Sequence, residues 1–151
     1  MDGRLYTGRI YDHAKIRQEY PKLLQICVMR WPPRFINLKA NKILHYLGLA
    51  PPVKLLKYYQ KQKKTEENWK KFVEKMLRYL VTDDLAEKDI WSVRYLLLAG
   101  TDVVLLCHEH FDENCHRRLL PDVILTEKEQ EAGVYQGEIY FDESVQTKLD
   151  W

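Results

Sequence analysis

The stretch DVVLLCHEHFDENCHRRLL, residues 102–120, places a continuous apolar run directly before a polar segment. An apolar run of this length, bounded by polar residues, is typical of a strand buried on both faces of a parallel sheet. Asn114 can cap a helix that runs to about residue 125. The order of strand, polar loop and helix predicts an α/β unit whose polar residues gather at the carboxyl end of the strand.

A second apolar run, residues 23–29, ends in the same way, at the loop Arg30-Trp31-Pro32-Pro33-Arg34. Its two prolines exclude both a helix and an inner strand, so Arg30 and Arg34 are predicted to lie on a loop. Ligands of parallel sheets usually bind at the carboxyl ends of the strands. We therefore expect the loops after residues 29 and 106 to form one site.

The rest of the chain alternates between helical and strand patterns. Apolar residues recur at helical spacing between residues 65 and 80. Other helical segments are expected at residues 12–20, 37–49, 51–60 and 84–99, a first strand at 4–8, and a hairpin around Gln136-Gly137. Strands separated by helices predict a three-layer α/β fold with a mostly parallel sheet. We expect residues 1–151 to form one domain, with 126–151 as an acidic C-terminal extension.

The composition does not favour a protein that is strongly charged, spans a membrane or is secreted. The 24 basic and 22 acidic residues give a net charge of only +2, so binding to nucleic acid or to a membrane would need a local patch. The chain has no apolar run of the roughly 20 residues that span a bilayer, and residues 1–9 lack a signal peptide. We expect a cytoplasmic protein with reduced thiols, because three cysteines do not suit a secreted disulfide framework.

The window from residue 107 to residue 118 holds two of the three cysteines and three of the five histidines. In the first turn of a helix, Cys115 would have a lowered pKa and would be a nucleophile, with His116 or Glu109 as acid and base. Arg117 and Arg34 would hold an anion there. The structural alternative is that Cys107 and Cys115 are small apolar residues packed on the sheet.

Two further interpretations stay open. Thiolates and imidazoles bind zinc, but Cys107 and Cys115 are eight positions apart and no second CxxC or HxxxH pair accompanies them, so we expect no metal or other cofactor. The lysine-rich stretch from residue 54 to 71 contains aromatic residues and could follow a phosphate backbone. A solvated helix face explains the same lysines.

The runs Val104–Glu109 and Asn114–Leu120 closely resemble the C-terminal signature of the domain-of-unknown-function 488 family: an apolar strand, Cys-x-Glu, a short acidic loop and Cys-His-Arg. Residues 5–8 look like the opening strand of that family, and 28–33 like its Asp-Val-Arg-x-x-Pro segment. The resemblance covers about residues 4–125. It implies a three-layer α/β domain, with nucleotide or nucleic-acid processing as a repeated suggestion. Val28 departs from the family, which often has an acidic residue there.

Our leading hypothesis is a protein that binds a nucleotide or nucleic acid at a Cys/His/Arg anion site and processes it. The expected catalytic residues are Cys115, His116 and Glu109, and the expected ligand-binding residues are Arg30, Arg34, Arg117, Tyr6 and Cys107. The alternatives are a non-catalytic module that binds another protein through its lysine-rich helix or acidic tail, and a zinc-binding protein. The sequence leaves open whether the protein is an enzyme.

Overall fold

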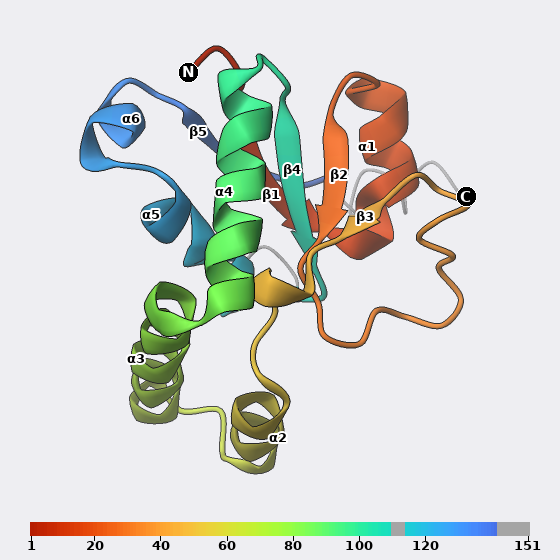
Figure 1. The fold of residues 1–151 in the computed structure, drawn as a ribbon. Coiled ribbons are helices and arrows are strands. Elements are labelled where there is room, and N and C mark those ends of the chain that lie inside the picture. The colour runs from red at the N-terminus through yellow and green to blue at the C-terminus, as the bar shows by residue number, and fades with distance from the viewer. Residues whose placement is uncertain (110–113, 142–151) are drawn as a thin grey trace.

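The computed structural model describes residues 1–109 and 114–141, and its centre is a five-stranded sheet (Figure 1). The strand order is β3-β2-β4-β1-β5, and every neighbouring pair is parallel. The strands are β1 (Leu5–Arg9), β2 (Leu24–Cys27), β3 (Leu44–His45), β4 (Val103–Cys107) and β5 (Tyr135–Ile139). The predicted three-layer α/β fold is confirmed.

Helices cover the sheet and extend beyond its carboxyl edge. The α-helices are α1 (His13–Glu19), α2 (Val53–Lys61), α3 (Glu66–Thr82), α4 (Asp84–Leu98), α5 (Leu120–Ile124) and α6 (Glu127–Glu131), and the 3-10 turns are η1 (Ile10–Asp12), η2 (Leu47–Leu49) and η3 (His116–Arg118). Figure 1 shows α4 lying across the sheet, with α2 and α3 beyond the carboxyl ends of the strands. Within the described ranges, no helix has both the length and the apolar character needed to cross a bilayer.

The central strand β4 is buried at every position, as its apolar run predicts. It pairs with β2 on one side and with β1 on the other. The backbone N–H of Val28 extends the pairing by donating to the carbonyl of Leu106 at 3.0 Å. The carboxyl ends of β2 and β4 are therefore adjacent, which is the arrangement that the two polar loops predict.

Three segments differ from the sequence-based expectations. The short helix expected in residues 37–49 is replaced by a turn, β3 and η2: the Asn37 side chain accepts from the N–H of Ala40 in a tight turn, and Lys42 has φ of 55°, which interrupts helical backbone. A single continuous helix from Asn114 is also wrong, because Cys115 has extended backbone and Pro121 lies in the first turn of α5.

The expected hairpin around Gln136-Gly137 is replaced by a single strand. Residues 135–139 form β5, which runs parallel to β1 with a register shift between Leu5 and Tyr6. Gly137 has φ of 98°, a conformation that favours glycine, and lies next to this irregularity, where Leu5 pairs with Tyr135 and Tyr6 with Gly137. The acidic end of the extension, residues 142–151, lies outside the described residues.

Gly48 joins the carboxyl edge of the sheet to α4. Its N–H donates to the buried Asp89 carboxylate at 2.7 Å, and its carbonyl accepts from the Tyr79 hydroxyl at 3.1 Å. A Cβ atom at this position would lie 2.4 Å from the backbone oxygen of Leu85. Only glycine lets η2 approach the helix this closely.

Gly48→Ala is therefore expected to destabilise the protein by about 2 kcal/mol, because backbone must shift to accept the added methyl group. Urea denaturation followed by circular dichroism measures the change. Gly8→Ala is the matched control, since its Cβ would meet only side-chain atoms at 3.4 Å. Equal stability losses in the two variants would contradict the close approach.

Candidate functional site

A cavity of about 300 Å³ opens where β2 and β4 end. Its walls come from the loop after β2, from α2, from the end of β4 and from η3. The lining residues are Tyr11, Met29, Arg30, Trp31, Pro33, Pro51, Leu56, Gln60, Cys107, His108, Glu109 and His116. Apolar and aromatic walls that carry a small number of polar side chains are typical of a small-molecule site, and this volume is at the lower end of the usual range.

Cys107 and Glu109 provide two acidic groups on the cavity wall. The Cys107 sulfur lies 3.8 Å from Oε2 of Glu109. Burial, together with the neighbouring Cys115 and Glu109, raises the pKa of Cys107 well above its usual value. Burial and the adjacent Cys115 also raise the pKa of Glu109 to about 7. A carboxyl group with such a pKa can both give and take a proton near neutral pH.

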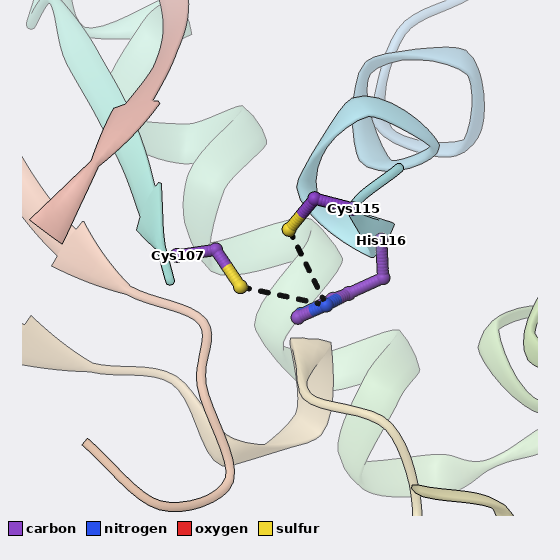
Figure 2. A group of neighbouring side chains, drawn as sticks. All are labelled: Cys107, Cys115 and His116. Carbon is purple, nitrogen blue, oxygen red and sulfur yellow. Dashed lines mark hydrogen bonds between the residues drawn. The ribbon is translucent and has the colours of Figure 1, made fainter. Parts of the chain in front are cut away.

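Cys115 and His116 lie directly beside Cys107 (Figure 2). The Nδ1 atom of His116 is 3.6 Å from the Cys107 sulfur and 4.0 Å from the Cys115 sulfur. Burial opposes ionisation of Cys115, but hydrogen bonds with Cys107 and His116 and the positive charges of His116 and Arg117 hold its pKa well below the usual value. The two sulfurs thus differ: Cys115 favours the thiolate and Cys107 the thiol.

The imidazole of His116 is oriented by the end of β2. Its Nε2 lies 2.7 Å from the backbone carbonyl of Val28. Position 28 therefore contacts the site through its main chain, while its side chain is fully buried in the core. An ordinary carbonyl oxygen only accepts hydrogen bonds, so Nε2 must carry a proton.

Arg117 is fully buried beneath the site and is paired with β5. Its Nε and Nη2 atoms donate to Oε1 of Glu138 at 2.9 and 2.5 Å. Thr7 donates to the other oxygen of Glu138 and lies 2.7 Å from the hydroxyl of Tyr135. Burial opposes the charge on Arg117, but Cys115 and Glu138 outweigh it and raise the pKa of the guanidinium. The charge of Arg117 thus favours the thiolate form of Cys115. Its Nη1 has no hydrogen-bond partner among the described residues.

The structure brings some of the predicted site residues together and separates others. Arg30, Cys107, Glu109 and His116 line the cavity, and Cys115 and Arg117 lie behind them without lining it. Arg34 is exposed on the loop and is not a lining residue. Tyr6 lies in a separate hollow with Leu23 and Asp102, at the amino ends of β2 and β4.

Sequence reasoning missed two groups of residues. Glu138, which neutralises Arg117, is one acidic residue in an acidic segment, so its local sequence carries no signal for a buried ion pair. Tyr11 and Trp31 form aromatic walls of the cavity. Trp31 could have been found, because it lies between the two arginines of a loop at a strand's carboxyl end.

Comparison with protein families identifies the chain. The family model DUF488-N3a, described as the active DUF488-N3 subclade, matches residues 9–128. The chain belongs to the DUF488 family. No curated protein and no solved structure matches it. In this DUF488 protein, the residues that match the family model include those that line the cavity and both site cysteines. The strand β5, with Glu138, lies beyond the matched residues.

Replacing Glu138 with glutamine is expected to destabilise this DUF488 protein by about 3 kcal/mol, because a buried guanidinium would lose its counter-charge. Urea denaturation measures the loss. The control is Glu131→Gln, an exposed position in α6, which should change stability by less than about 0.5 kcal/mol. Similar stabilities for the two variants would show that the Arg117–Glu138 pair does not support the fold.

Proposed function

We propose that this DUF488 protein binds a nucleotide, or a single-stranded nucleic acid through one of its bases, in the cavity between the ends of β2 and β4. We further propose that Glu109 carries acid–base chemistry on that ligand. The observation that carries the proposal is the convergence of aromatic walls, an arginine and a carboxyl group on one small cavity.

The aromatic walls suit a planar ring. Tyr11 and Trp31 both line the cavity, and Trp31 is 49% exposed at its rim. The hydroxyl of Tyr11 lies 2.7 Å from Nδ1 of His108, which fixes the tyrosine ring beside the cavity. Bases stack on aromatic side chains whatever their sequence, and each stacked base contributes about 1–3 kcal/mol. A volume of about 300 Å³ accepts one base with its sugar and excludes a duplex.

Positive charge lies on the wall of the cavity and next to it. Among the described residues, no carboxylate forms an ion pair with Arg30, whose Nε donates to the carbonyl of Pro51 at 3.1 Å and whose Nη2 makes longer contacts with the carbonyls of Leu47 and Ala50. On α2, Lys57 and Lys61 are exposed and directly follow Leu56 and Gln60, which line the cavity. A guanidinium and two lysines can neutralise phosphates on either side of a bound base.

Glu109 is the carboxylic acid among the described residues that line the cavity. Cys107 and His116 lie beside it on the same wall, so a reacting atom in the cavity would have a carboxyl, a thiol and an imidazole within reach. General acid–base groups of this kind typically accelerate a reaction by a factor of about 10²–10⁴.

A second candidate function is favoured by the exposed surface of α4. Trp91, Tyr95 and Leu98 are 47%, 67% and 51% exposed and follow one another at helical spacing. An apolar stripe of this kind is typical of a surface that another protein covers. In that case the chain would act as a non-catalytic interaction module.

A thermal-shift screen separates the two functions, because a ligand that binds only the folded state raises the melting temperature. The ligands are nucleosides, nucleoside monophosphates, short single-stranded oligonucleotides and inorganic phosphate. We expect a nucleotide to stabilise the wild type by about 2.7 kcal/mol at one hundred times its dissociation constant. Trp31→Ala should lose most of this shift, and the matched control Trp91→Ala should keep it. The nucleotide proposal would be contradicted if no ligand raised the melting temperature of the wild type. It would also be contradicted if Trp91→Ala lost the nucleotide-induced rise and Trp31→Ala kept it.

A further inference from the structure

Three potential metal ligands converge behind the cavity wall. The sulfurs of Cys107 and Cys115 and a ring nitrogen of His116 all lie within 4.8 Å of one another. The three side chains are 3%, 3% and 7% exposed, so bulk water does not separate them. Figure 2 shows both sulfurs directed toward the imidazole, one from the end of β4 and the other from the residue before η3.

The spacing of these atoms fits a tetrahedral zinc ion. Zinc lies about 2.3 Å from a thiolate sulfur and about 2.0–2.1 Å from an imidazole nitrogen. A tetrahedral angle between two such bonds separates sulfur from nitrogen by about 3.6 Å. The observed separations from Nδ1 of His116 are 3.6 Å to Cys107 and 4.0 Å to Cys115. The two sulfurs lie within 4.8 Å of each other, and two zinc–thiolate bonds at the tetrahedral angle would separate them by about 3.8 Å, so side-chain movements of up to about 1 Å would complete the geometry.

The orientation of His116 supplies an independent argument. Because Nε2 must donate to the carbonyl of Val28, a neutral ring has its free lone pair on Nδ1, the atom that faces both sulfurs. Histidines that bind metals usually donate their other ring N–H to a backbone carbonyl or a carboxylate, which fixes the tautomer. The end of β2 thus orients the ring so that Nδ1 of His116 faces both sulfurs, as binding of a metal by all three residues requires.

The fourth coordination position of such an ion would face the cavity. Cys107 and His116 both line it, whereas Cys115 lies behind, so an ion held by all three would have one face toward the cavity. Three protein ligands with one open position are characteristic of catalytic zinc sites. Oε2 of Glu109, 3.8 Å from the Cys107 sulfur, lies where it could bond to a water on that open face.

We propose that Cys107, Cys115 and His116 bind one zinc ion, with its fourth coordination position open to the cavity. This site goes beyond the proposed function: the leading sequence-based expectation was no metal, and a zinc-binding protein was the alternative that the sequence left open. Two thiolates neutralise the charge of the ion, and the ion in turn makes it favourable to bury both thiolates. Zinc content is measured without any nucleotide. A failure of the zinc proposal is therefore distinguishable from a failure of the nucleotide proposal.

The test begins with wild-type protein purified under reducing conditions without chelators. Plasma mass spectrometry should find about one zinc per chain. After zinc removal, added Co²⁺ should produce a thiolate-to-cobalt charge-transfer band in the near ultraviolet and the intense visible bands of a tetrahedral complex. A substoichiometric zinc content together with no charge-transfer band would overturn the proposal, and this measurement needs no variant.

Variants then locate the ion. Cys115→Ser and His116→Ala should each lose most of the bound zinc and weaken the cobalt spectrum. The matched control is Cys27→Ser, which alters the third buried cysteine, outside the cluster, and should keep about one zinc per chain. Full zinc retention in both cluster variants, or loss in Cys27→Ser alone, would place the metal elsewhere and overturn the assignment.

Discussion

The pairing of β2 with β4 is the constraint on which the site depends. β2 is the first strand to follow α1, and β4 comes about 80 residues later, yet their parallel register places Cys27 opposite Leu106. One step further along, the backbone N–H of Val28 bonds to Leu106, and the carbonyl of Val28 accepts from His116. A change of register by a single residue would invert which groups face the cavity. Backbone pairing therefore sets the geometry of the side chains at the cavity.

A second constraint is the charge buried beneath the site. Arg117 is fully buried, and a buried guanidinium destabilises the folded state unless a counter-charge is paired with it. Glu138 of the edge strand β5 forms that ion pair. The charge of Arg117 in turn favours the thiolate form of Cys115. The strand β5 thus contributes to the site although it lies outside the part of the chain that matches the family model. The carboxyl-terminal strand and the Cys-His-Arg segment form one electrostatic unit.

The sequence predicted those features that depend on local pattern. The apolar runs at residues 23–29 and 102–107 correspond to buried strands, and the periodicity between residues 65 and 80 corresponds to α3, whose Phe72, Met76 and Leu80 are buried. Features that depend on partners distant in the chain were not predictable. Parallel pairing with β1 makes residues 135–139 an added strand where the local sequence suggested a hairpin. Arg117 was expected to hold an external anion, and its actual partner, Glu138, is brought to it by that strand.

The central claim is that the cavity between β2 and β4 is where this protein binds its ligand, and the indole N–H signals of its tryptophans test it most directly. In a ¹H–¹⁵N spectrum titrated with a nucleoside monophosphate, the signal of Trp31 on the cavity rim should shift progressively and saturate. The signal of Trp91 on the outer face of α4 should stay in place. A shift of Trp91 with no change at Trp31 would contradict the account and would move the binding surface to α4.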